Sequence, residues 1–188
     1  MKKLIGLITA VLAVAFTGQF HGQATADSTP PTTGNGTASI TVVAPTSDAL
    51  YFVSVPNIVF PTEKIGDHTS NVNGQGDNQY RVVDLRGGST GYTIQAQITA
   101  FTLVGGVKKL PVDNFLTTVK DGQNQAVTGT SDVDIYQAQG TVAVGNADAN
   151  GTQTSGDISA DMVLNPHSAM LGNGLYEATI THSLVTGV

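Results

Sequence analysis

Two aspartates, Asp132 and Asp134, have the residue type and spacing that could hydrolyse a glycosidic bond. On an extended strand their carboxylates would lie about 7 Å apart on one face, within the roughly 6.5–9.5 Å separation of inverting glycosidases. Val133 and Ile135 alternate with them and would point to the opposite face. This alternation favours a solvated strand face that also protects a sheet edge. The sequence suggests no neighbour that would raise either pKa, so a carbohydrate-active enzyme is only the remote alternative.

A loop further along the chain spaces its oxygen-bearing side chains as a calcium-binding loop does. Asn146, Asp148, Asn150, Gly151 and Asp157 fit positions 1, 3, 5, 6 and 12 of such a loop. Asn replaces the usual Asp at the first position, Asp replaces the usual Glu at the last, and no helix pattern flanks the loop. Turns rich in Asn, Asp and Gly match this pattern by chance, so a plain turn is favoured and calcium is the alternative.

Other catalytic arrangements find little support. The histidines beyond the N-terminal region, His68, His167 and His182, lack the spacing of a zinc site. The chain has no cysteine, which excludes disulfides and thiolate chemistry. Asp84 and Arg86, two residues apart on a probable strand, are expected to form a structural ion pair. We therefore expect a protein that is not an enzyme and needs no cofactor.

The stretch Val82–Phe101 is predicted to organise the fold as a strand, a glycine-rich tight turn at residues 86–91 and a longer strand. Apolar and polar residues alternate strictly along the second strand, which indicates one buried and one solvent-facing side. The side predicted to be buried carries Tyr92, Ile94, Ala96, Ile98 and Ala100. The side predicted to be wet carries Thr93, Gln95, Gln97 and Thr99.

The C-terminal stretch Leu175–Val185 repeats this alternation. One face would carry Tyr176, Ala178, Ile180, His182 and Leu184. Further strands are predicted from similar short apolar runs. The full set is Ala38–Val43, Leu50–Val55, Arg81–Leu85, Tyr92–Leu103, Asp132–Ala138, Thr141–Val144, Ile158–Leu164 and Leu175–Val185.

Turn signals separate these strands, as in the segments 71–76 and 121–124, which are rich in Asn, Gly and Asp. No segment has a helical period of 3.6 residues. Many short strands with plentiful glycine predict an all-β fold, a single-domain antiparallel β-sandwich or a barrel-like fold. That domain is expected to span residues 38–188.

The N-terminal residues have the features of a secretory signal peptide. Lys2 and Lys3 precede a 13-residue apolar run from Leu4 to Phe16, and the polar region that follows closes on Ala24–Ala26. This pattern predicts cleavage after residue 26. Residues 27–37 are rich in Pro, Thr and Gly and are expected to form a flexible leader.

The composition of the expected mature chain excludes some partners. Loss of Lys2 and Lys3 changes the net charge from −6 to −8. Nucleic-acid and anionic-membrane binding both need a positive surface, so both are disfavoured. No later segment is long and apolar enough to span a membrane. We expect a secreted, extracellular protein.

The first alternating stretch resembles a known family. Val82–Arg86 is similar to the Val-x-Asp-x-Arg strand that comes before the first Trp-x-Leu motif of the WxL surface proteins of Gram-positive bacteria. Gly91 precedes the motif, Tyr92 stands where the family has tryptophan, and Ile94 replaces the leucine. Leu50–Pro56 also resembles the family's entry strand.

The C-terminal stretch resembles the family's second motif. The family pattern Gly-x-Tyr-x-Ala-x-Ile-x-Trp-x-Leu matches Gly174, Tyr176, Ala178, Ile180, His182 and Leu184. His182 stands at the tryptophan position, and the chain contains no tryptophan. The resemblance covers about residues 39–185.

The resemblance implies a secreted protein that attaches non-covalently to peptidoglycan or another cell-wall glycan, within a surface complex. The motif residues that it makes candidates for ligand binding are Tyr92, Ile94, His182 and Leu184. Thr93, Gln95 and Gln97 are candidates as well, because the polar face of their strand offers hydrogen-bond donors and acceptors suited to sugars. Asp84, Arg86, Gly91 and Tyr176 would then be motif residues with structural roles. Tyr92 and His182 have a second interpretation as core residues, because each shares an apolar face with its neighbours. An adhesion or assembly module that binds another surface protein or a host ligand through a sheet edge is the other functional interpretation.

Overall fold

The computed structural model describes residues 39–43, 49–63, 70–88, 90–165 and 172–187. The chain divides into two compact units, Met1–Ile40 and Thr41–Val188, and all the described strands belong to the second. The predicted signal peptide, the leader, His68 and His167 lie outside the described residues. Residues 39–43 form no strand, contrary to the prediction of a strand at Ala38–Val43.

The described residues form strands and no helix, which confirms the all-β prediction. In particular, they contain no helix long and apolar enough to cross a membrane. The strands are β1 Leu50–Ser54, β2 Ile58–Val59, β3 Ser70–Gly76, β4 Arg81–Asp84, β5 Tyr92–Ile98, β6 Thr102–Leu103, β7 Val112–Val119, β8 Val127–Gly129, β9 Val133–Asp134, β10 Gly140–Gly145, β11 Gly151–Thr154, β12 Ile158–Leu164, β13 Tyr176–Glu177 and β14 Ile180–Thr186.

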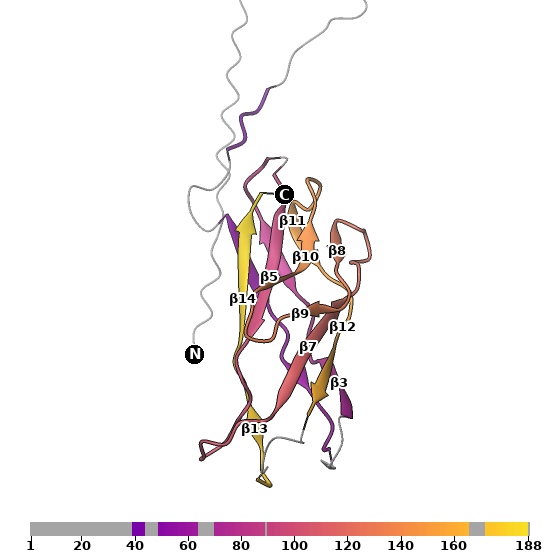
Figure 1. Ribbon diagram of the computed structural model, residues 1–188. Helices are drawn as coiled ribbons and strands as arrows, with labels where there is room; N and C mark the ends of the chain where they lie inside the picture. The colour runs from indigo at the N-terminus through magenta and orange to yellow at the C-terminus, as the bar shows by residue number, and fades with distance from the viewer. Residues whose placement is uncertain (1–38, 44–48, 64–69, 89, 166–171, 188) are drawn as a thin grey trace, which may run out of the picture. The chain divides into compact units, whose positions relative to one another are not determined.

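These strands form antiparallel sheets in the arrangement of a β-sandwich (Figure 1). One sheet has the order β14-β5-β10-β8, a second β2-β3-β12-β7-β9 and a third β1-β4-β11, while β13 and β6 form a short ribbon. Figure 1 shows β14, β5 and β10 side by side, with β7, β12 and β3 in the other half of the domain. The described strands do not close into a barrel, since each sheet ends in edge strands.

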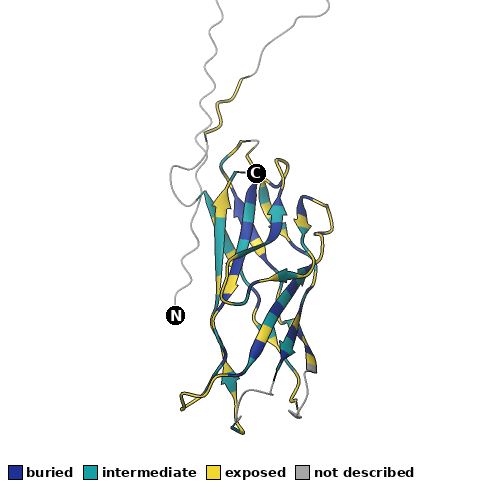
Figure 2. Cartoon of the chain, viewed as in Figure 1, coloured by how far each residue is buried: buried dark blue, intermediate teal, exposed yellow. Residues whose placement is uncertain are grey.

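The alternation predicted for β5 is confirmed and fixes the position of the core. Tyr92, Ile94, Ala96 and Ile98 are all buried, whereas Gln97 on the opposite face is exposed. Phe115 of β7 and Ile158 of β12 bring apolar side chains from the five-stranded sheet into the same core. Figure 2 shows this burial as dark blue bands along β5 and β7.

The prediction of a turn at residues 71–76 was wrong, because this segment is the strand β3, paired with β12. Val72 and Gly74 occupy its buried face, and the exposed positions between them are polar. A Cβ atom at Gly74 would lie 2.7 Å from the ring of Phe60 and 2.8 Å from Ile58. The glycine therefore leaves room for side chains that pack across the strand, which the sequence pattern does not reveal.

The glycine-rich turn at residues 86–91 links two sheets and does not close a hairpin. Its preceding strand, β4, pairs with β1 and β11, while β5 pairs with β14 and β10. Gly87 has a φ of 68°, which glycine adopts without steric cost. The turn thus carries the chain from one sheet to the next and sets where β5 begins.

Candidate functional site

The two motif strands, β5 and β14, lie next to each other in one sheet. Their register pairs Ile94 with Leu184 and Ala96 with His182. The two leucine positions of the family pattern are therefore direct cross-strand partners. The two tryptophan positions, Tyr92 and His182, are not cross-strand partners, because Tyr92 pairs with Thr186 at the end of the segment and His182 pairs with Ala96.

Tyr92 and Ile94 are both 0 % exposed, so a ligand cannot contact their side chains, and their prediction as ligand-binding residues is corrected. The ring of Tyr92 packs on the backbone of β10, where a Cβ atom at Gly145 would lie 2.3 Å from Cζ of the ring. Its hydroxyl is buried and has no hydrogen-bond partner among the described residues. Burial and the nearby charge of Asp84 raise the pKa of Tyr92 to about 12, so the phenol stays neutral.

His182 and Leu184 are half-buried and pack against the core from the edge strand β14. Nδ1 of His182 lies 2.9 Å from the hydroxyl oxygen of Tyr80, and the two rings meet edge to face with centroids 5.3 Å apart. Burial lowers the pKa of His182, although the backbone carbonyl of Pro56 acts in the opposite direction. The lowered pKa favours the neutral imidazole, which shares one hydrogen bond with the Tyr80 hydroxyl, and the direction of this bond is set by the tautomer of the ring.

The other face of the same two strands is polar and uncharged. It carries Thr93, Gln95 and Gln97 from β5, and the residues paired with them are Val185, Ser183 and Thr181 of β14. Gln97 is exposed and Gln95 is half-buried. Nε2 of Gln97 donates to the carbonyl oxygen of Gln137 at 3.0 Å, which fixes one end of the face. We call these six residues the polar face; all of them except Val185 are polar, and their amides and hydroxyls can both donate and accept hydrogen bonds.

The expected pair of Asp84 and Arg86 is confirmed. Nε of Arg86 donates to Oδ1 of Asp84 at 2.9 Å and Nη2 to Oδ2 at 2.6 Å, so the contact is bidentate. Nη2 also donates to the carbonyl oxygens of Thr90 and Gly91. The arginine beside it lowers the pKa of Asp84, which keeps the buried carboxylate ionised. These contacts close the turn directly before Tyr92 and give Asp84, Arg86 and Gly91 a structural role.

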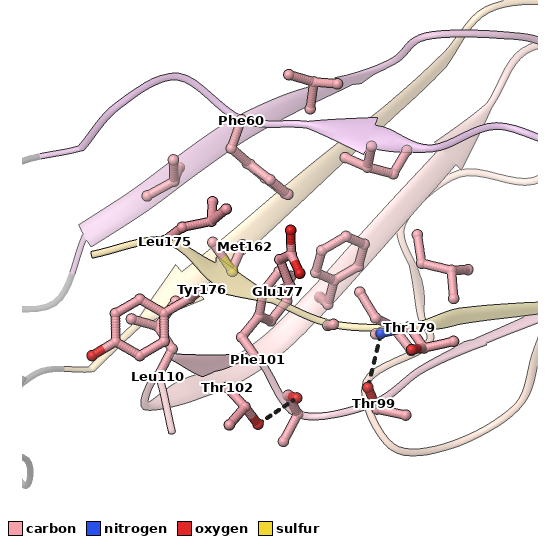
Figure 3. A pocket seen from close by; sticks show the side chains of 18 of the residues that line it. Phe60, Thr99, Phe101, Thr102, Leu110, Met162, Leu175, Tyr176, Glu177 and Thr179 are labelled. Carbon is pink, nitrogen blue, oxygen red and sulfur yellow. Dashed lines mark hydrogen bonds between the residues drawn. The ribbon is translucent and has the colours of Figure 1, made fainter. Parts of the chain in front are cut away.

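A groove of about 1430 Å³ opens between the segment 55–63 and the segment 172–182. Its floor contains the aromatic cluster Phe60, Phe101 and Phe115, with ring centroids 5.7–6.4 Å apart. Met162 and Leu110 extend this apolar floor. Figure 3 shows Phe60, Met162 and Phe101 converging within it. The sequence prediction missed this groove.

Tyr176, which the family pattern made a structural residue, forms part of one wall of the groove. Its hydroxyl accepts from the backbone N–H of Gly172 and donates to the carbonyl oxygen of the same residue, both at 3.1 Å. The short strand β13 around it pairs with β6 through Leu103. Tyr176 thus fixes the chain where it enters the C-terminal motif.

Asp132 and Asp134 do not share a strand face. Asp132 has a φ of 55° and lies before β9, whereas Asp134 lies within β9. Oδ1 of Asp134 accepts from the backbone N–H groups of Phe115 and Tyr136, and Asp132 contacts Thr118. Both carboxylates are thus used in local structure, and their geometry gives no support to a catalytic pair.

The segment that matches the calcium-loop pattern is divided by a strand. Gly151 opens β11, which separates Asn146 and Asp148 from Asp157. Oδ1 of Asn146 accepts from the backbone N–H of Asp148 at 2.9 Å, and Oδ1 of Asp157 accepts from Gln79 at 3.0 Å. Nδ2 of Asn150 donates within the turn. Because the end of the pattern lies beyond β11, these side chains do not surround one ion, and the loop is a turn.

Within the described part of the chain, no three His, Asp or Glu side chains are grouped so that they could hold a metal ion. Comparisons with protein-family models, with curated proteins and with solved structures found no match to this chain. The polar face and the groove are therefore the two features from which a function can be argued.

Proposed function

We propose that this chain is a secreted, WxL-like surface protein that attaches non-covalently to a cell-wall glycan. The observation that carries the proposal is the polar face, on which the two motif strands present uncharged amides and hydroxyls side by side. Sugars expose hydroxyl groups that need donors and acceptors at close range, and neutral partners of this kind suit them. The proposal assigns no catalytic step to the chain.

The polar face also accounts for how a chain without tryptophan could still bind. Tyr92 and Ile94 are buried, so stacking on these two motif side chains is unavailable to a ligand. Hydrogen bonds from Thr93, Gln95 and Gln97 then replace stacking as the source of affinity. The motif positions contribute by holding β5 and β14 in register.

A cross-strand double variant tests this proposal. Gln95 pairs with Ser183 on the polar face, and we expect Gln95→Ala with Ser183→Ala to reduce retention on purified, protein-free sacculi about tenfold. The matched control is Gln75→Ala with Ser159→Ala, which removes the same two residue types from a paired position on another sheet. Equal retention of both double variants would remove the polar face as the binding site.

Salt dependence provides a second prediction. The expected mature chain has a net charge of −8, and a wall that carries teichoic acids is anionic, so long-range electrostatics oppose binding. At about 0.5 M salt the Debye length is well below 10 Å, which weakens this repulsion while close hydrogen bonds persist. We expect retention on sacculi to be equal or higher at this salt concentration. Retention that disappears with modest salt would contradict attachment through neutral contacts.

A further inference from the structure

The turn that follows β6 leaves three large apolar side chains exposed at one place. Val107 is 92 % exposed, more than any other large apolar side chain in the described part of the chain, and Val104 is 55 % exposed. The backbone N–H of Val104 donates to the carbonyl oxygen of Leu175 at 2.9 Å, and Leu175 is 62 % exposed. Single exposed apolar residues are common on protein surfaces, whereas a group of them marks an interaction site. We call Val104, Val107 and Leu175 the apolar tip.

The turn that carries the apolar tip has a defined shape. The backbone N–H of Leu103 donates to the carbonyl oxygen of Lys108 at 2.8 Å, and the N–H of Gly106 donates to that of Leu103 at 3.0 Å. Gly105 has a φ of 75°, which glycine adopts without steric cost. The side chain of Leu103 packs on the neighbouring segment, where a Cβ atom at Gly174 would lie 2.7 Å from its Cδ1. The turn is therefore closed and packed, and it presents the apolar tip to solvent in a fixed arrangement.

Two lysines directly follow the apolar tip. Lys108 and Lys109 are both exposed, and residues 99–112 contain no Asp or Glu. A Cβ atom at Gly172 would lie 3.6 Å from Cδ of Lys108, so the stem of this lysine lies against the neighbouring segment. Glu177 is the carboxylate of β13, and no ion pair joins it to either lysine within the described residues. Two free cations thus accompany the apolar tip in a chain whose expected mature net charge is −8.

We propose that the apolar tip inserts shallowly into the surface of an anionic lipid bilayer, with Lys108 and Lys109 at the level of the phosphate groups. Apolar side chains are stabilised when they leave water for the acyl region. The long stems of the lysines let their ammonium groups remain among the headgroups. Each lysine near an anionic membrane surface adds an electrostatic attraction. An apolar group with adjoining cations therefore matches both layers of such a surface.

The size of the apolar tip favours lipid over a protein partner. Three side chains on one turn offer far less than the roughly 800 Å² that each partner buries in a stable protein interface. A bilayer needs no surface of complementary shape, because its lipids rearrange around what enters. Figure 1 shows β13, which adjoins the turn, at one end of the domain and β11 toward the other. A turn at the end of a domain can reach a bilayer without the rest of the domain entering it.

The net charge that disfavours an anionic membrane acts over the whole chain, whereas insertion depends on the charges near the turn. At physiological salt, exposed charges more than about 8 Å apart are largely screened from one another. The bilayer phosphates therefore interact mainly with Lys108 and Lys109, and less with carboxylates elsewhere on the domain. The contact uses none of the polar-face residues, so it can fail without affecting the proposed wall attachment.

Co-flotation of the secreted protein with vesicles tests the apolar part of the contact. We expect the protein to float with vesicles of equal parts phosphatidylglycerol and phosphatidylcholine, and Val107→Asp to weaken this binding at least about tenfold. The matched control is Val53→Asp, on β1, where the side chain is 51 % exposed and lies outside the turn. Absence of the protein from the floated vesicles, or equal binding of the two variants, overturns the proposal.

A second pair of variants tests the charges. Lys108→Gln with Lys109→Gln should weaken binding to the same vesicles at least about tenfold. The control is Arg81→Gln with Lys120→Gln, which removes the same charge from two exposed residues elsewhere. Equal losses in both double variants, or equal binding to vesicles of phosphatidylcholine alone, would overturn the proposal. Binding should also weaken at about 0.5 M salt, which is opposite to the expectation for sacculi and distinguishes the two proposals.

Fluorescence shows whether the turn enters the bilayer, because the chain contains no tryptophan. Val107→Trp places a single reporter at the apolar tip, and Val53→Trp places a matched reporter on β1. With the anionic vesicles we expect the emission of Val107→Trp to shift to shorter wavelength and to be quenched by brominated lipid. The emission of Val53→Trp should stay unchanged. Equal quenching of the two proteins, or no quenching of either, overturns insertion through the apolar tip.

Discussion

Replacing Asp84 by Asn tests how much the turn before the first motif depends on a single ion pair. Asp84 is 3 % exposed, and its two oxygens accept from the Nε, Nη2 and backbone N–H groups of Arg86. Hydrogen bonds to charged groups contribute about 1.5–3 kcal/mol, and breaking a fully buried pair costs about 3–5 kcal/mol. The side chain of Arg86 is 21 % exposed, so water recovers part of the loss. We therefore expect the free energy of unfolding to fall by about 2–3 kcal/mol.

Urea denaturation of the secreted protein measures this change, and thermal melting provides a second readout. For a domain of this size the expected loss corresponds to a Tm lower by about 4–12 °C. The control is Asp161→Asn, which neutralises an exposed carboxylate on β12 and should change stability by less than about 0.5 kcal/mol. If Asp84→Asn has an effect as small as the control, the ion pair does not stabilise the turn and the reasoning fails.

The pH dependence of the same pair of proteins separates charge from packing. The pKa of Asp84 is lowered in the folded state, so the unfolded chain binds its proton first as the pH falls. The stabilisation is complete above about pH 3.9 and is lost as the pH falls toward the lower folded pKa. The Asn variant has no such proton to bind. We therefore expect the stability difference between the two proteins to shrink below about pH 4, and a constant difference would assign the effect to packing.

Three further predictions concern the buried side chains and the calcium pattern. Gly145→Ala places a Cβ atom 2.3 Å from the ring of Tyr92 and should cost about 1–3 kcal/mol by urea denaturation; a neutral result would mean that the ring has room to move. Burial lowers the pKa of His182, so the unfolded chain binds its proton first and stability should fall as the pH drops below about 6.5, by up to about 1.4 kcal/mol per pH unit. His182→Gln should flatten this slope, and an unchanged slope would point to another group. Adding calcium or a chelator should leave the Tm unchanged, whereas an upward shift that Asp148→Ala abolishes would restore the loop as a site.

The sequence predicted best those strands whose two faces differ clearly in polarity. β12 runs from Ile158 to Leu164, which are the predicted bounds. In β5 the alternation from Tyr92 to Ile98 is strict, because one face meets the core and the other does not. A period of two in the sequence then translates directly into the sheet.

β7 was missed because its inward and outward positions do not follow the polarity of its residues. Phe115, Thr117 and Val119 are buried, while Leu116 between them is only half-buried. The pairing with β12 also shifts between Val163 and Leu164, which breaks the alternation near the start of β7. Because the polar Thr117 is buried and the apolar Leu116 is only half-buried, polar and apolar residues do not alternate along β7 as they do along β5.

The groove could not be predicted because no local segment forms it. Phe60, Phe101 and Phe115 come from three separate parts of the chain and meet only after the sheets pack. Its second wall, from residue 172 onward, belongs to a fourth part. The apolar segment 39–43 was predicted to be a strand, although no strand within the described chain pairs with it.

The register of β5 and β14 limits what the motif positions can do. Side chains two residues apart point to the same face of a strand. Because Tyr92 and Ile94 point into the core, Thr93 and Gln95 point to the opposite face. The apolar pair Ile94–Leu184 and the polar pair Gln95–Ser183 are neighbours along the strands but face opposite sides. A substitution at Tyr92 therefore affects a ligand only by moving the strand, whereas one at Gln95 can affect it directly. Tyr92→Ala should accordingly lower both stability and retention on sacculi, whereas Gln95→Ala should lower retention without a matching loss of stability. This difference distinguishes a binding residue from one that positions the strand.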